Sequence, residues 1–333
     1  MFINDQSVLL TYVEANPGID FLSLPPTIEQ VGSKYFLPLF GKPFFDDADA
    51  FCTTPQENDT VGVGFMNRLQ KAVANLAMYE YIPIAEVQIT DAGLRRGHSE
   101  THPGAFKYQV QELQRALLNR GLQAIEELLA YMDENVADDF FDNWRISLEF
   151  THYRVLLINS GREFEKYYSS LQYPRRTYML LRTTLYNVQS LVVAEAISEE
   201  VYQELITENQ NPTPSFGEEQ AELLELLKPA LAHLTISRGI YQLAAAMDEN
   251  GVHVLSQFNE PGDSAGKKVA APSSQLTMMI NDAESIGQSW MGKAIKYLND
   301  TASETVFPTW YEALQEAETP LPQNDGLTGC FGL

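Results

Sequence analysis

The chain has 333 residues, of which 44% are hydrophobic, so it is long enough to bury a substantial core. Acidic residues outnumber basic ones by 45 to 22, and the formal net charge of −23 opposes non-specific binding to nucleic acid or to an anionic membrane. With no basic segment at the start, no apolar run of roughly 18 residues and two widely separated cysteines, we expect a reduced intracellular protein without a signal peptide or membrane helix.

The spacing of apolar residues predicts that the first half of the chain is mostly helical. Short amphipathic helices are expected around residues 9–13 and 28–36, where apolar side chains recur three or four positions apart, and another after Gly41. Residues 65–78 predict a longer helix. The apolar stripe over residues 106–132 predicts the longest helix of this half.

Both halves of the chain also predict one small β-hairpin among their helices. In the first half, Val87 and Ile89 alternate with polar residues up to a Thr-Asp-Ala-Gly turn that ends at Gly93. In the second half, an Asn-Gly turn at residues 250–251 is followed by the alternating residues 252–254. Each hairpin is expected to follow a long helix.

The two halves are similar enough to indicate an internal duplication. Residues 69–95 align without a gap on residues 227–253, with identical residues at six positions, against about two expected by chance. A looser match sets residues 40–45 on 197–202. A further block carries four identical pairs, including two of the three tryptophans: Gly121/Gly287, Tyr131/Tyr297, Phe141/Phe307 and Trp144/Trp310.

We therefore predict two copies of one unit, residues 1–150 and 151–318, and an extended C-terminal docking tail at 319–333. Capping boxes at residues 160–163 and 309–312 are expected to begin two of the later helices. The predicted fold class is mainly α, with two tandem helical-bundle units, each with a long helix and a small β-hairpin.

Glycine interrupts the longest apolar stripe of each copy at the same place. Gly121 lies within the stripe of residues 106–132, and Gly287 lies within the matching stripe of residues 276–298. A glycine inside a helix costs about 1 kcal/mol relative to alanine. Because both copies keep this unfavourable residue, we expect a close approach of two helices, or a kink, at both positions.

Several segments resemble chemical motifs, and for each of them a structural interpretation is favoured. A Gly-x-Gly at residues 62–64 lacks the third glycine of a dinucleotide-binding turn. Residues 262–268 resemble a phosphate loop but are one residue short and lack the Ser/Thr that would bind magnesium, so a linker is favoured. The aspartate clusters at 46–49 and 138–142 lack the ligand pattern of a calcium loop. We predict no catalytic residue and no cofactor.

His98, Glu100 and His102 have some features of a metal site. Two histidines four residues apart can share one face of a helix and bind zinc. Here Gly97 precedes them and Pro103 follows, so the segment is expected to be a loop, and no further ligand is evident nearby. The sequence therefore predicts no metal site.

Basic residues are concentrated between His152 and Arg182, a stretch of net charge +4 in an otherwise acidic chain. One interpretation is a set of surface ion pairs, each worth about 0–1 kcal/mol. The other is a docking edge that meets the acidic face of another subunit. The interface candidates in this stretch are Arg162, Arg175, Arg176 and Arg182.

The last residues of the chain also allow two interpretations. Residues 319–333 contain many helix breakers and no helical period, which is typical of a frayed terminus. However, Cys330, Phe331 and Leu333 make this segment apolar, as expected for a peptide that folds when it binds a partner groove. These three residues are therefore further interface candidates.

Four segments of the first half, taken in order, resemble a poorly characterised family of tailed bacteriophages and prophages. These segments are Lys34–Gly41, Ala72–Ala77, Ile89–Arg95 and Ala124–Asn135. The first unit looks like the small helical head–tail connector (adaptor) proteins beneath the portal ring, with a weaker echo in residues 151–318. Known adaptors have one such unit, whereas this chain has two.

The resemblance implies a structural, non-enzymatic virion protein of the neck, assembled in the host cytoplasm. Its implied partners are copies of itself in a ring, twelvefold by family resemblance, together with the portal and a downstream neck or tail protein. DNA would pass through without specific binding, and an acidic wall is compatible with that passage because it repels phosphate. The alternatives are another phage neck or tail-completion protein, a non-virion helical binding protein, an enzyme, or an acidic mimic of DNA.

Overall fold

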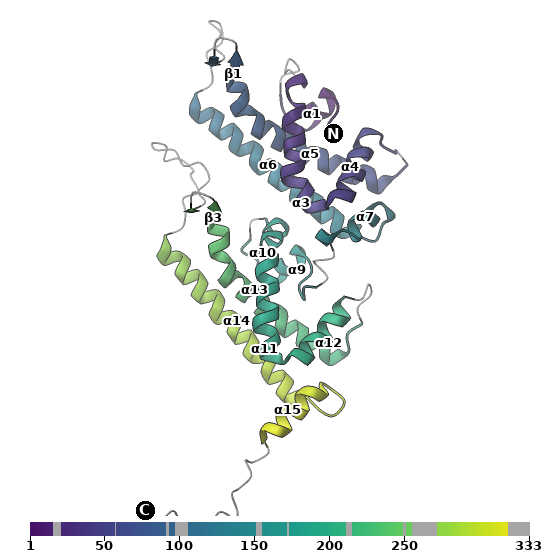
Figure 1. Ribbon diagram of the computed structural model, residues 1–333, viewed down its shortest axis with the longest axis vertical. Coiled ribbons are helices and arrows are strands. Elements are labelled where there is room, and N and C mark those ends of the chain that lie inside the picture. The colour runs from purple at the N-terminus through teal and green to yellow at the C-terminus, as the bar shows by residue number, and fades with distance from the viewer. Residues whose placement is uncertain are drawn as a thin grey trace, which may run out of the picture. The chain divides into compact units, whose positions relative to one another are not determined.

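A computed structural model shows a chain built mainly of helices, which confirms the mainly α character (Figure 1). It divides into two compact units, the first formed by Met1–Arg154 and Asn159–Met179, the second by Val155–Ile158 and Leu180–Leu333. The structure describes residues 1–15, 21–56, 58–90, 93–96, 106–150, 155–171, 173–210, 215–248, 251–254 and 272–318.

The first unit is organised around two long helices that pack against each other, α5 (Thr60–Glu86) and α6 (Lys107–Glu134) (Figure 1). The other elements of this unit are α1 (Gln6–Tyr12), η1 (Phe21–Ser23), α2 (Pro25–Val31), the π-helix η2 (Gly32–Phe36), α3 (Leu37–Phe40), α4 (Lys42–Thr53), η3 (Asp139–Phe141), α7 (Asp142–Arg145), α9 (Gly161–Tyr167) and the first residues of α10 (Pro174–Val188).

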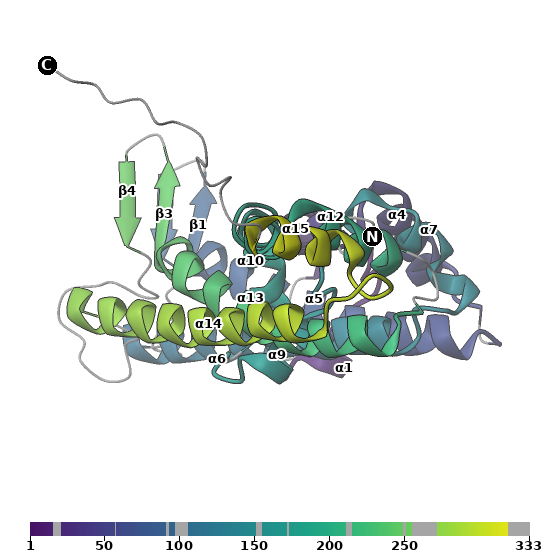
Figure 2. The ribbon, with the colours of Figure 1, turned by 90° about the horizontal axis from the view of Figure 1, so that it is seen from below.

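The second unit has the same plan, with the long helices α13 (Glu218–Ala244) and α14 (Ser273–Thr301) packed against each other (Figure 2). Its other elements are the remainder of α10, the π-helix η4 (Gln189–Val193), α11 (Ala194–Ile197), α12 (Glu199–Asn209) and α15 (Pro308–Glu318). Within the described residues, no helix is both long enough and apolar enough to cross a membrane.

The backbone repeats in detail between residues 24–45 and 181–202. In both, a helix runs into a π-helix and a four-residue helix, and the chain then turns at a residue of positive φ before the next helix begins. The turning residue is Gly41, with φ of 72°, in the first unit and Ser198, with φ of 71°, in the second. A non-glycine residue rarely adopts this conformation, so its presence in both copies indicates that the turn belongs to the shared plan.

The paired glycines lie where two long helices approach closely, as predicted. A Cβ atom at Gly121 of α6 would lie 2.6 Å from Leu76 Cδ2 of α5. In the second unit, a Cβ atom at Gly287 of α14 would lie 2.7 Å from Leu234 Cγ of α13. The same leucine-to-glycine contact thus fixes the long helical pair in both units.

The finer part of the predicted fold class, a long helix and a small β-hairpin in each unit, is corrected by the structure. In the described residues each unit is built on two long helices, and its strands are only four residues long. The extended residues continue the helices directly and pair over only four positions, β1 (Val87–Thr90) with β2 (Gly93–Arg96) and β3 (Ala245–Asp248) with β4 (Gly251–Val254). A two-stranded pair of this length is marginal by itself, so the packing of the two long helices dominates each unit.

Of the two predicted capping boxes, one helix start is confirmed and one is wrong. The Ser160 hydroxyl accepts a hydrogen bond from the backbone N–H of Glu163 at 3.2 Å, so Ser160 is the N-cap of α9. In contrast, α15 begins at Pro308, which places Thr309 inside its first turn. Proline is favoured at the first helical position, and here it begins the helix before the threonine can cap it.

Candidate functional site

The most elaborate polar arrangement that the structure describes lies on the outer face of α6. On this face, Leu118, Leu122 and Leu129 are buried, and Glu126, between them, is only 6% exposed. The chain at residues 159–179 belongs to the same compact unit. It supplies the hydrogen-bond partners of Glu126, which explains why a carboxylate can be buried there.

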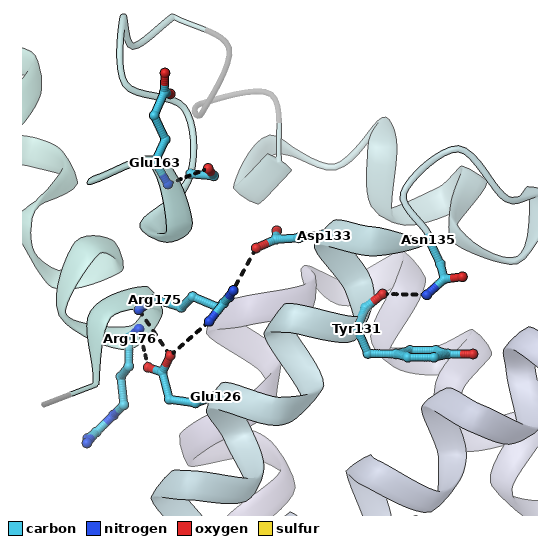
Figure 3. A network of polar contacts seen from close by, with 8 residues as sticks. Glu126, Tyr131, Asp133, Asn135, Glu163, Arg175 and Arg176 are labelled. Atoms are coloured by element: carbon cyan, nitrogen blue, oxygen red, sulfur yellow. Dashed lines mark hydrogen bonds and ion pairs between the residues drawn. The ribbon is translucent and has the colours of Figure 1, made fainter. Parts of the chain in front are cut away.

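Glu126 caps the beginning of α10 (Figure 3). Its two carboxylate oxygens accept hydrogen bonds from the backbone N–H groups of Arg175 at 3.1 Å and Arg176 at 2.8 Å. These groups lie in the first turn of α10, where backbone donors lack partners within the helix. The negative charge also lies at the positive end of the helix dipole. Glu126 therefore does for α10 what an N-cap side chain normally does, but from another helix.

Glu126, Asp133, Arg175 and Arg176 form a cluster that we call the cap cluster. The Arg175 side chain completes it: Arg175 Nε donates to Asp133 Oδ2 at 3.2 Å, and Arg175 Nη1 lies 3.8 Å from Glu126 Oε2. The Arg176 side chain points away from Glu126 (Figure 3). One guanidinium thus serves two carboxylates of α6, and the cluster fastens residues 159–179 to that helix.

Burial dominates the electrostatics of the cap cluster. It raises the pKa of Asp133 to about 6, although the charge of Arg175 and its hydrogen bond act in the opposite direction. Burial also raises the pKa of Glu126, against the two backbone hydrogen bonds and the charge of Arg175. Both shifts follow from moving a carboxylate away from water. Keeping Glu126 and Asp133 charged in the cap cluster therefore costs electrostatic free energy.

A small cavity of about 40 Å³ lies next to Asp133 and Arg175, lined also by Leu129, Trp144 and Tyr178. Ligand pockets usually have volumes of about 300–1,000 Å³. This cavity has room for water molecules only. The polar groups around it already bind one another, so the geometry supports a structural joint and offers no space for a substrate.

The predicted interface arginines separate into different environments. Arg175 and Arg176 lie in the cap cluster. Arg162 is exposed on α9, and its charge is among the influences that lower the pKa of Asp133. Arg182 is half-buried on α10 and interacts with other groups of the chain. The remaining candidates, Cys330, Phe331 and Leu333, lie outside the described residues.

Glu126 and Asp133 were not among the residues predicted from the sequence. The available signal was a second apolar face on α6, because residues 118, 122, 126, 129 and 133 recur at helical spacing and three of them are leucine. A helix with two apolar faces is expected to be covered on both sides. Two carboxylates on such a covered face are expected to need hydrogen-bond or ion-pair partners, and this requirement was the signal in the sequence.

The histidine segment at 98–102 lies outside the described residues. Within the described part of the chain, no group of three or more His, Cys, Asp or Glu side chains is arranged to hold a metal ion. Cys52 is buried, and burial raises the pKa of its thiol to about 12, so this cysteine is a poor nucleophile at neutral pH.

Comparison with known proteins identifies one family. Its model, described as a family of unknown function (DUF6712), matches the chain twice, at residues 36–154 and 178–319. The two matches support the internal duplication. No curated protein and no solved structure matches the chain.

Proposed function

The chain belongs to the DUF6712 family, and we propose that it is a structural virion protein of a tailed bacteriophage, a head–tail connector (adaptor) that forms a ring below the portal. The observation that carries this proposal is the construction of one helical unit twice in a single chain. Each unit depends on a helical pair held together by a leucine–glycine contact, Leu76 with Gly121 and Leu234 with Gly287. Such pairs are stiff building elements, as a ring wall requires.

The charge of the chain supports the same role. A formal charge of −23 is unfavourable for a protein that must hold DNA, because phosphate contacts need lysine and arginine. It is favourable for the wall of a channel through which DNA has to slide without adhering. The proposed ring therefore lets DNA pass without binding it specifically.

A ring needs two different complementary surfaces on every subunit. We propose that exposed basic residues such as Arg162 meet an acidic face of the neighbouring copy, and that the segment 319–333 contacts a partner. The proposed partners are further copies of this chain, the portal, and a downstream neck or tail protein. The proposed location is the virion neck, after assembly in the host cytoplasm.

Peptide mass spectrometry of gradient-purified, nuclease-treated phage particles tests this function. The expected result is the presence of this chain in filled particles at a small, fixed ratio to the main shell protein. Its reproducible absence from particles in which other neck proteins are detected would overturn the proposal and favour a non-virion helical binding protein. Presence at the tail tip instead of the neck, shown by immunogold labelling, would favour another tail-completion role.

A further inference from the structure

The second unit exposes large apolar side chains along one face of α10 and the following π-helix η4. Leu180 and Leu191 are 63% and 65% exposed, although both are large aliphatic residues. Thr183 and Asn187 lie between them and are also exposed, so the four positions follow the three-four spacing of one helix face. We call these four residues, with the exposed Tyr186 at their edge, the α10 stripe.

The first unit shows that the fold does not need this apolar surface. The equivalent positions in α2 and η2, and in the residues before them, have the same exposure but carry Ser23, Pro26, Gln30 and Lys34. Since the two copies share backbone and burial pattern here, the leucines of the second copy add nothing to packing that the first copy requires. Exposed apolar groups that the fold does not use are typical of a binding surface.

The segment 319–333 has the chemistry to occupy the α10 stripe. It contains Leu321, Leu327, Phe331 and Leu333, and the chain has no Lys, Arg or His after Lys296. Fifteen residues can extend over at most about 50 Å, so the segment can reach a neighbouring molecule.

The α10 stripe carries no charge that would oppose docking of the segment. Residues 183–194 contain no acidic group that would repel Asp325 of the segment.

We propose that the α10 stripe of one copy is the docking site for residues 319–333 of a second copy. This inference rests on the proposed ring, because a donor segment and an acceptor surface on the same chain make a heterologous contact that can repeat from copy to copy. An extended peptide with apolar anchors on a helix face is a common mode of recognition.

Disulfide cross-linking of the full chain tests the contact directly. Asn187→Cys places a thiol in the middle of the stripe, and Gln30→Cys places one at the equivalent exposed position of the first unit as a matched control. The native Cys330 supplies the thiol of the segment, while Cys52 stays unreactive because it is buried and its thiol pKa is raised to about 12. After mild oxidation, peptide mapping identifies which cysteines have joined, and non-reducing denaturing gel electrophoresis shows whether the link lies within one molecule or between two.

We expect the Asn187→Cys variant to form an intermolecular disulfide between its new thiol and Cys330. Its yield should be about tenfold that of the corresponding disulfide in the Gln30→Cys variant, because docking raises the local thiol concentration. Adding Cys330→Ser should abolish the link. Replacing Leu180 by Ser and Leu191 by Lys, the residues of the first unit, should reduce it about tenfold.

Equal yields from both cysteine variants, a link within one molecule, or a dominant link between the introduced thiols of two copies would overturn the inference. Sedimentation of the same samples separates this failure from that of the proposed function. Large closed assemblies in which the stripe thiol does not join Cys330 would refute only the docking site. A chain that stays monomeric at all concentrations would refute the ring as well.

Discussion

The two units share a backbone plan but anchor its first segment by different chemistry. In the first unit, Gly32 leaves room for aromatic rings: a Cβ atom there would lie 3.2 Å from Phe2, and Phe2 packs edge-to-face on Phe45 at 5.0 Å. In the second unit the position of Gly32 is taken by Gln189 and that of Phe45 by Tyr202. The comparison shows that the same local geometry can be stabilised by ring packing or by a buried amide.

The buried amide of the second unit forms a closed set of hydrogen bonds. Gln189 accepts from the backbone N–H of Leu157 at 3.0 Å and donates to the carbonyl oxygen of Val155 at 2.7 Å and to the hydroxyl of Tyr202 at 3.1 Å. Hydrogen bonds restrict position more than apolar contacts do, and a missing partner leaves a buried polar group unsatisfied. The second unit therefore depends on single polar atoms, whereas the first depends on the volume of its rings.

The largest expected difference comes from truncating equivalent core residues, Phe44→Ala in the first unit and Val201→Ala in the second. Phe44 is fully buried and contacts several aromatic rings, so its loss should lower the free energy of unfolding by about 3–5 kcal/mol. The smaller Val201 should cost about 2 kcal/mol. Hydrogen exchange of α5 and α13 measures each unit, with the exposed Leu22→Ala as control. Equal losses of unfolding free energy in the two variants would show that the aromatic rings around Phe44 do not stabilise the first unit more than aliphatic packing stabilises the second.

A smaller effect is expected from Gln189→Leu, which keeps the apolar bulk and removes the hydrogen bonds. Leaving the groups around Gln189 unsatisfied should cost about 2 kcal/mol and should speed exchange of the Leu157 amide most. Gln203→Leu is the matched control, because Gln203 is exposed and its side chain donates to Glu199 on the surface of α12. If both variants lose the same stability, the amide is not the anchor of this segment.

Much of the fold was predictable because residues that recur at equivalent positions of both copies indicate where the backbone needs a particular residue type. The repeated glycines at 121 and 287 predict a close helix contact, and the structure shows that contact at both positions. The extent of α5 and α13 was not predictable from local patterns, because it depends on packing against other elements. The start of α15 differs for a local reason, since Pro308 takes the first helical position ahead of Thr309.

The cap cluster could not be predicted from the sequence, because its members are far apart in the chain. The basic stretch drew attention to Arg175 and Arg176 as a surface edge, whereas Arg175 binds Glu126 and Asp133, more than forty residues earlier in the chain. Charge counting identifies basic residues but not their partners. Only the tertiary structure brings the start of α10 to α6, so the sequence could not decide between ion pairs and a docking edge, and the structure shows ion pairs for Arg175.

The smallest effect concerns pH, and it contrasts Asp133 of α6 with Asn299, which occupies the equivalent position of α14 and is exposed. The pKa of Asp133 is raised to about 6 from its ordinary value of 3.8, so the folded state binds its proton more tightly than the unfolded state does. This favours folding at low pH, and the benefit is lost as the pH rises through about 6.

Asp133→Asn should therefore flatten the pH dependence of stability between about pH 4 and pH 7, by about 1–2 kcal/mol after screening by solvent. Hydrogen exchange of α9 and the start of α10, corrected for intrinsic rates, should show the change, while α14 should show none. Asn299→Asp serves as the reciprocal control: the new carboxylate is exposed and can still accept the hydrogen bond from Trp310 Nε1, so it should change the pH dependence little. A wild-type chain whose α9 exchange is independent of pH over this range would show that Arg175 offsets the burial of Asp133 completely. The cap cluster would then fasten the start of α10 to α6 equally well throughout this pH range.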